Sequence, residues 1–158
     1  MSRWQDKVVL ITGGSAGLGR ALAEAFARGG AQVVIAARTE GPLQDAARQI
    51  ESAGGRCEAV AADVLNDEDV ERLVRNVVEK HGRLDVLVNA AGRSARGAIA
   101  DTSVDDFQEL LDLNFLATVR CTRSALPHLM KTRGHVVNIG SLASKVAARY
   151  LGKGEFRP

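Results

Sequence analysis

Hydrophobic and polar positions along the chain follow two different spacings. Five runs of mostly aliphatic residues are too short for helices and are typical of buried parallel strands. They lie at residues 8–11, 32–37, 57–62, 84–89 and 135–139. Between these runs, apolar residues recur three and four positions apart, which predicts amphipathic helices. Strands that alternate with helices in this way predict an α/β fold with a parallel sheet.

Residues that start or stop helices fall between the same runs. Glycines are expected to end the first three helices, at positions 29–30, 54–55 and 82. Pro42 stands where the second helix is expected to begin. Asn66 precedes three acidic residues, a pattern that predicts the N-terminal cap of the third helix.

The fourth predicted helix is the longest, and it is apolar on more than one side. It begins with a capping-box pattern, Ser103-x-x-Asp106, and Pro127 is expected to bend or end it before Gly134 closes it. Its apolar positions are Phe107, Leu110, Leu111, Leu113, Phe115, Leu116 and Ala117. Such a helix needs a second partner. A homo-oligomer through residues 103–131 and a missing part of the fold are both open readings.

Asn114 lies inside this apolar segment. If its amide is buried it must be hydrogen-bonded, because an unpaired buried amide costs on the order of 1–3 kcal/mol. The alternative is an asparagine on the exposed flank of the helix.

Four glycines crowd into seven residues immediately after the first predicted strand. Thr12 ends the strand, and the cluster is Gly13, Gly14, Gly17 and Gly19. A strand, a glycine turn and a helix in this order predict an anion site, because free N–H groups and the positive end of the helix dipole face the turn. Glycines also let the backbone approach a pyrophosphate closely. A purely structural turn is the alternative reading.

The end of the second strand bears on which dinucleotide would bind. A site that prefers NAD places an acid there to bind the ribose 2′-hydroxyl. This chain has Ala37 followed by Arg38, and an arginine suits a 2′-phosphate by charge and by geometry. We therefore expect NADP(H), with NAD(H) second, unless Arg38 is an ordinary surface residue.

The segment resembles the short-chain dehydrogenase/reductase family, whose members open with TGxxxGxG. Thr12, Gly13, Gly17 and Gly19 match this motif, and the resemblance extends from residue 7 to about residue 152. It implies one NAD(P)-binding domain over residues 1–158. That domain would be a Rossmann-type doubly wound parallel sheet of about five strands in the order 3-2-1-4-5, with helices on both faces. It also implies an NAD(P)-dependent oxidoreductase that acts on an alcohol/carbonyl pair.

The same resemblance assigns roles to particular residues. Asp63 would bind the adenine amino group, although an aspartate at a strand end is also a common helix cap. Asn114 would hold a water that leads to the catalytic lysine. Ser141, just past the fifth strand where open sheets place active sites, would be the catalytic serine that binds the substrate oxygen. The implied cofactor-binding residues are Gly13, Ser15, Gly17, Leu18, Gly19, Arg38, Asp63, Val64, Asn89, Ala90 and Gly92. Of these, Val64 would pack beside the adenine, and Asn89 to Gly92 match the NAAG motif, which stabilises the sheet and lines the nicotinamide-side ribose.

The chain departs from the family at the YxxxK motif, whose tyrosine supplies the proton in hydride transfer. Gly154 stands where the tyrosine is due, and Pro158 is close to the place of the lysine. Tyr150 has no lysine four residues on. Lys145, Lys153, His128 and His135 have no motif context either. We therefore expect the family fold to be truncated before this motif, with residues 142–158 as an irregular tail.

This truncation has consequences for the sheet and for activity. The fifth strand would leave an unpaired apolar edge at Val136, Val137 and Ile139. The alternative function is a catalytically inactive NADP(H)-binding module. A methyltransferase or an epimerase is a weaker reading. Epimerases prefer another glycine spacing, and methyltransferases usually carry an acid where Ala37 and Arg38 stand.

Composition narrows the remaining classes. A chain of 158 residues with 46% hydrophobic and 25% charged residues suits one globular domain. The net charge of +2 is spread along the chain, so we expect no nucleic-acid or membrane partner and a small-molecule substrate. Cys57 and Cys121 lack the spacing of metal ligands, so we expect reduced core thiols and no metal. No secretory signal and no apolar run of about 20 residues is visible, which favours a cytoplasmic location.

Overall fold

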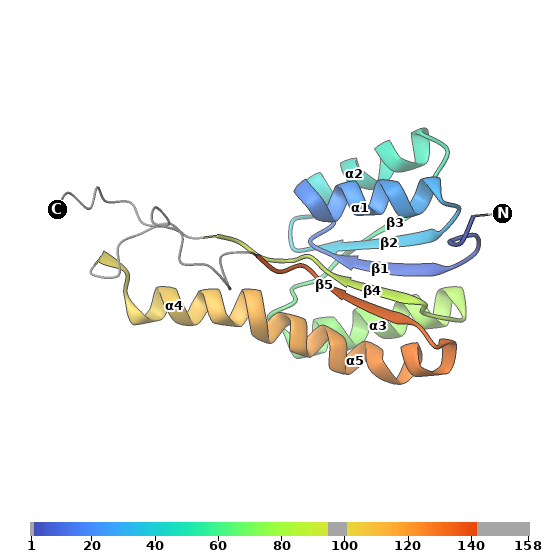
Figure 1. Cartoon of the computed structure of the whole chain (residues 1–158). Coiled ribbons are helices and arrows are strands. Elements are labelled where there is room, and N and C mark those ends of the chain that lie inside the picture. The colour runs from blue at the N-terminus through green and yellow to red at the C-terminus, as the bar shows by residue number, and fades with distance from the viewer. Residues whose placement is uncertain (1, 95–100, 142–158) are drawn as a thin grey trace.

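A five-stranded parallel sheet organises the molecule (Figure 1). The computed structural model describes residues 2–94 and 101–141. The strands are β1 (Val8–Thr12), β2 (Gln32–Ala37), β3 (Arg56–Ala61), β4 (Val86–Asn89) and β5 (His135–Asn138). They stand in the order β3-β2-β1-β4-β5, and every neighbouring pair is parallel. The predicted fold class and strand order are confirmed, with strand ends that move by one or two residues.

Helices cover both faces of the sheet (Figure 1). They are α1 (Gly17–Arg28), α2 (Glu40–Ser52), α3 (Asp67–His81), α4 (Val104–Leu111), the π-helical turn η2 (Asp112–Leu116) and α5 (Ala117–Thr132). Alternate residues of β1 face opposite layers: Val9 packs in the core under α1 and α2, and Leu10 in the core under α3 and α5. Because both faces are covered, the strands read as continuous aliphatic runs.

The predicted helix caps are largely present. The Asn66 side chain accepts a hydrogen bond from Asp69 N at 3.0 Å, and Gly82 ends α3 in the left-handed region at φ 74°. Ser103 and Asp106 form the predicted capping box of α4. The predicted start of α2 was wrong. The helix begins at Glu40, and Pro42 falls in its first turn, where a missing N–H leaves no bond unmade.

The long predicted helix is a continuous helical segment from 104 to 132, interrupted only by η2. It does not end at Pro127, which lies inside α5. Pro127 is exposed, so water can satisfy the carbonyl that its missing N–H leaves unpaired. The segment ends instead at Arg133, in the left-handed region at φ 51°, followed by Gly134.

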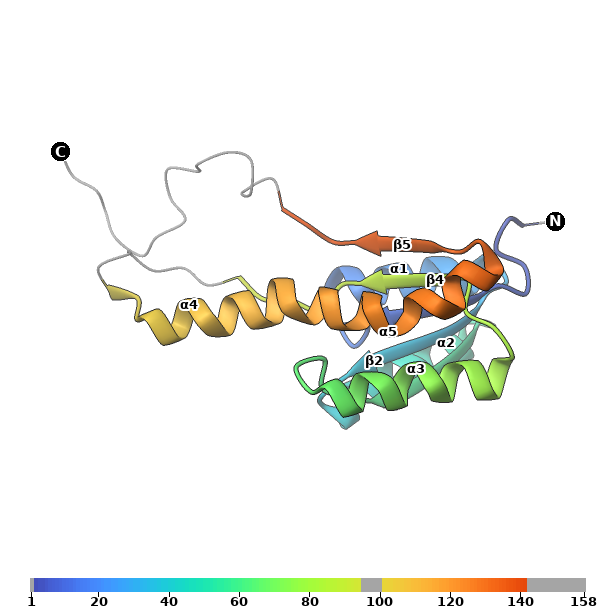
Figure 2. The ribbon, with the colours of Figure 1, turned by 90° about the horizontal axis from the view of Figure 1, so that it is seen from below.

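Helix α4 extends past the carboxyl edge of the sheet and buries none of its residues (Figure 2). A stripe of exposed apolar side chains therefore runs along α4, η2 and α5, as the sequence predicts. We call it the helix stripe; its members are Val104, Phe107, Leu111, Phe115, Val119, Leu126 and Met130. No helix among the residues described above is both long enough and apolar enough to cross a bilayer.

The two edges of the sheet differ. On edge strand β3, Glu58 is paired with Lys80 at 2.9 Å and with His81 at 3.1 Å. On edge strand β5 every residue is exposed, and Val136 and Val137 each leave more than a third of their surface in water. The predicted apolar edge at β5 is therefore present.

Candidate functional site

The glycine turn between β1 and α1 depends on glycine for two different reasons. Gly13 and Gly17 have positive φ angles of 69° and 55°. A Cβ atom on Gly13 would lie 2.7 Å from Ala91 N, whereas one on Gly17 would meet nothing within 4 Å. Ala16 caps α1 without a side-chain hydrogen bond, so the first N–H groups of the helix remain available to a ligand.

Thr12 joins this turn to the loop that follows β4. Its Oγ1 accepts hydrogen bonds from Ala90 N and Ala91 N, each at 3.3 Å, and only 1% of the residue is exposed. The sequence indicates Thr12 only as the end of a strand and a motif match. A buried hydroxyl at a strand end is the signal that it must bond to something nearby.

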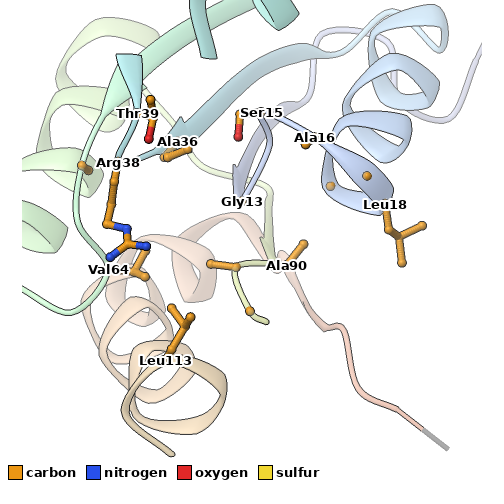
Figure 3. A pocket seen from close by; sticks show the side chains of 16 residues that line it. Gly13, Ser15, Ala16, Leu18, Ala36, Arg38, Thr39, Val64, Ala90 and Leu113 are labelled. Atoms are coloured by element: carbon orange, nitrogen blue, oxygen red, sulfur yellow. The ribbon is translucent and has the colours of Figure 1, made fainter. Parts of the chain in front are cut away.

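A cavity of about 440 Å³ opens at the carboxyl ends of β1, β2 and β4 (Figure 3). Nine of the eleven predicted cofactor-binding residues line it: Gly13, Ser15, Gly17, Leu18, Gly19, Arg38, Val64, Ala90 and Gly92. The other lining residues are Ala16, Ala36, Ala37, Thr39, Ala62, Ala91 and Leu113, which were not among the predicted cofactor-binding residues. Most of them are small, and Ala36 and Ala37 lie at the end of β2.

Arg38 gives the cavity its charge. It is the only charged residue among those that line the cavity, and none of them is an acid. Its guanidinium extends from the end of β2 towards Val64 (Figure 3). Within the described part of the chain no ion pair or hydrogen bond of its side chain is present, although ten ion pairs are formed elsewhere. The cationic group is therefore available to an anion.

Asp63 does not line the cavity. Its side chain accepts a hydrogen bond from Leu65 N at 3.0 Å, and its own N–H donates to Asp69 Oδ2 at 2.9 Å. These bonds hold the loop between β3 and α3. The helix cap is Asn66, so the alternative reading of Asp63 as the cap was wrong.

Asn89 lies behind the cavity wall, with 3% of its surface exposed. Its Nδ2 donates to Asn138 Oδ1 at 2.8 Å and to Thr122 Oγ1 at 3.1 Å. It therefore joins β4 to β5 and to α5, while Ala90 and Gly92 beyond it face the cavity. The sequence indicated the residue but not its partners, because both are distant along the chain.

Asn114 lies in η2 and is exposed, so of the two readings the one that holds is an asparagine on the exposed flank of the helix. The reason is that this part of the helix runs beyond the edge of the sheet. Both ends of its amide are nevertheless bonded: Oδ1 accepts from Arg93 N at 2.9 Å and Nδ2 donates to Arg93 O at 3.0 Å. A Cβ on Gly92 would lie 2.9 Å from Asn114 Oδ1, so glycine permits this close approach.

The predicted catalytic serine lies at the end of the described part of the chain. Ser141 follows β5, is exposed and does not belong to the cavity lining. Of the other titratable candidates, His135 begins β5, and its backbone N–H donates to Asp85 O. It therefore lies at the amino end of the strand, away from the cavity at the carboxyl ends. His128 lies on α5. Lys145, Tyr150, Lys153, Gly154, Pro158 and the predicted tail 142–158 lie outside the described residues.

The two cysteines are free and buried, as predicted, in the cores on opposite faces of the sheet. Burial raises the pKa of the Cys57 thiol to about 12 and that of Cys121 to about 11. Both are therefore protonated at neutral pH and are not nucleophiles. Among residues 2–94 and 101–141, no group of three His, Cys, Asp or Glu residues is placed to hold a metal ion.

The family model for short chain dehydrogenases matches residues 7–151, so the chain belongs to that family. It is 39% identical over 141 residues to a meso-2,3-butanediol dehydrogenase of Serratia marcescens, covering 89% of this chain and 55% of that protein. It is also 39% identical over 146 residues to an L-fucose dehydrogenase of Bos taurus, covering 92% and 53%. The chain thus spans about half the length of the curated relatives it matches.

Solved structures match the fold closely. A short chain dehydrogenase from Mycobacterium smegmatis superposes with a TM-score of 0.89 at 33% identity, over 96% of this chain and 65% of the other. An actinorhodin polyketide ketoreductase solved with NADPH gives a TM-score of 0.88 at 31% identity, over 96% and 59%.

Proposed function

We propose that this chain supplies the NADP(H) site of an oxidoreductase that acts on an alcohol/carbonyl pair. One observation carries the proposal: an unpaired arginine and a glycine turn at a helix N-terminus face the same cavity, which has no acid in its lining. The relatives named as butanediol and fucose dehydrogenases support the reaction class. The ketoreductase solved with NADPH supports the cofactor class.

The residues present fit such a cofactor. The N–H groups of the first turn of α1, at Gly17 to Gly19, would bind the pyrophosphate, because Ala16 makes no side-chain cap that would occupy them. The space beside Gly17 is open, since a Cβ there would meet nothing within 4 Å. Arg38 would bind the 2′-phosphate. Val64 and Ala90 would pack against the adenosine and the second ribose. When bound, the cofactor exchanges a hydride with the carbon of the alcohol/carbonyl pair.

Two polar residues would act on the nicotinamide side. Ser141 would donate a hydrogen bond to the substrate oxygen. Asn114 would act by holding the backbone of Arg93, next to the Gly92 wall of the cavity, in one conformation. Asp63 would contribute through the loop it holds rather than by direct contact.

A second candidate is an NADP(H)-binding module without catalysis. It is favoured by Gly154, which stands where the tyrosine of the YxxxK motif is due. It is also favoured because Ser141 is not among the residues that line the cavity. A reaction without its general acid loses about 10²- to 10⁴-fold in rate.

Titration of the purified chain with NADPH and with NADH, followed by nicotinamide fluorescence and calorimetry, tests the proposal. We expect saturable binding with NADPH bound more tightly. Equal or tighter binding of NADH would refute the preference, and no binding of either would refute the site. NADPH turnover with a panel of carbonyl compounds that is lost in Ser141→Ala separates the first candidate from the second.

We also propose an oligomeric state and a compartment for the chain. The exposed helix stripe suits a homo-oligomer through residues 103–131, because exposed apolar patches of this kind mark interaction sites. The two unpaired, buried thiols suit a reducing compartment such as the cytoplasm.

A further inference from the structure

Three polar side chains from three elements meet at the carboxyl edge of the sheet. Asn89 is the last residue of β4, Asn138 is the last of β5, and the two are paired in register. Thr122 reaches them from α5. The Asn89 amide nitrogen donates to both neighbours, at 2.8 Å to Asn138 Oδ1 and 3.1 Å to Thr122 Oγ1. Both hydrogens of one buried amide are therefore used to join a strand and a helix to β4.

The two segments that follow Asn89 and Asn138 lead to different places. On one side, residues 90–92 line the cavity. On the other side, residues 139–141 lead to Ser141. A backbone bond joins the two at this point, from Ile139 N to Asn89 O at 3.0 Å. The three side chains thus join β4 to β5 where the cavity wall and the Ser141 segment begin.

Packing alone does not fix this end of β5. All four residues of the strand are exposed, and no strand lies on its outer side among those described. A short edge strand of this kind is held by its backbone bonds to β4 and by whatever side chains fasten its ends. At the carboxyl end of β5, the side chain of Asn138 accepts a hydrogen bond from the Asn89 amide, and Thr122 accepts a second one from the same amide.

We propose that Asn89, Asn138 and Thr122 form a positioning unit that holds the Ser141 segment at a set distance from the cofactor-lining loop 90–92. The proposal rests on the proposed function for what the loop binds. The positioning itself is a property of the chain without cofactor. None of the three residues lines the cavity, so they act through the backbone on either side of them.

The chain offers a matched control for Thr122. Thr132 is on the same helix and is also half-buried, and its hydroxyl donates to Leu84 O at 2.7 Å, near the amino end of β4. Replacing either threonine by valine removes one hydroxyl and keeps the shape of the side chain. The two variants therefore loosen opposite ends of the same interface between α5 and the sheet.

Amide hydrogen exchange in the free chain, measured by NMR, tests the positioning. The reporters are Ile139 N–H, bonded to Asn89 O, and His135 N–H, bonded to Asp85 O. In Thr122→Val we expect exchange at Ile139 to become about fivefold faster with little change at His135, the effect of losing one hydrogen bond. In Thr132→Val we expect exchange at His135 to become faster, with little change at Ile139. Equal acceleration of both amides in both variants would overturn the proposal.

A second pair of variants tests the link to the cofactor. Asn138→Leu removes the acceptor for Asn89 Nδ2, whereas Asn138→Asp keeps one at an exposed position. We expect Asn138→Leu to raise the Kd for NADPH and the Ile139 exchange rate by about fivefold each, and Asn138→Asp to restore both. If Asn138→Leu has the same Kd for NADPH and the same Ile139 exchange rate as the wild type, the positioning role is contradicted. If the wild-type chain binds no NADPH, the proposed function fails, and the exchange rates alone still decide the positioning.

Discussion

A Cβ atom at Gly19 would lie 2.3 Å from the carbonyl oxygen of Gly13. Because the oxygen belongs to the backbone of the glycine turn, it cannot move without opening the turn. We expect Gly19→Ala to destabilise the fold by about 1–3 kcal/mol, through overpacking, and to abolish NADPH binding. Urea unfolding and fluorescence titration measure the two effects.

Gly17→Ala serves as the comparison, since its Cβ would enter open space and only its φ of 55° is unfavourable for alanine. We expect a smaller loss of roughly 1 kcal/mol. A stability for Gly19→Ala equal to that of wild type would show that the turn is not closely packed.

Arg38 is expected to select the cofactor. Arg38→Ser removes the only charge in the cavity lining and should weaken NADPH binding about 10- to 100-fold, the cost of losing hydrogen bonds to a charged group. NADH binding should change little, because it has no 2′-phosphate. Calorimetry with both cofactors measures the ratio. Arg28→Ser, at another exposed arginine outside the cavity lining, is the control and should leave both affinities unchanged. An equal loss for NADPH and NADH in Arg38→Ser would place the arginine elsewhere than at the 2′-phosphate.

Asp85 is expected to make stability depend on pH in the acid range. Burial acts to raise its pKa, but hydrogen bonds from Arg83, Val8 N–H and Lys7 outweigh burial and hold the pKa below its ordinary value. A carboxyl with a lowered pKa in the folded state stabilises the fold above its unfolded pKa, and this contribution is lost as the pH falls below about 4. Asp85→Asn should therefore cost about 1–3 kcal/mol at pH 7 and progressively less on acidification.

Urea unfolding of both proteins between pH 7 and pH 3 measures this difference. Asp45→Asn is the control, because Asp45 pairs with Arg48 on the exposed side of α2 and should contribute less than about 1 kcal/mol. A difference between wild type and Asp85→Asn that stays constant over this range would show that the carboxylate charge is not the source of the stability.

The helix stripe is expected to cause self-association. Phe107 and Phe115 are 43% and 59% exposed, so replacing both with glutamate should shift the sedimentation of the chain towards the monomer with little change in its unfolding free energy. Leu18→Glu is the control, since Leu18 is 56% exposed but lies on α1. If the wild-type chain sediments as a monomer at all concentrations, the stripe does not join copies of this chain.

Local features of the fold were predictable because their causes are local. Asn66 and Ser103 lie within three residues of the N–H groups that they cap. The strand order followed from the family motif at Gly13 to Gly19. Hydrogen-bond partners that are distant in sequence could not be predicted. Asn114 bonds to Arg93, 21 positions away, and no spacing in the sequence reveals it.

The candidate site follows the same rule. Nine predicted residues share one cavity because they belong to loops at the carboxyl ends of adjacent strands, which topology alone brings together. Asp63 does not share the cavity lining, because its side chain bonds within its own loop. The hydrogen bonds of Thr12 were not predicted, because its partners, Ala90 and Ala91, lie 78 and 79 positions further along the chain.

The unequal edges of the sheet limit how copies of the chain can add to one another. Glu58 on β3, with its ion pair to Lys80, opposes the approach of a further strand, whereas the exposed valines on β5 permit it. Within the described part of the chain, an added strand would therefore pair with β5 and not with β3. If two copies joined through β5, each would present only its β3 edge, so the assembly would close as a pair and would not extend into a fibril.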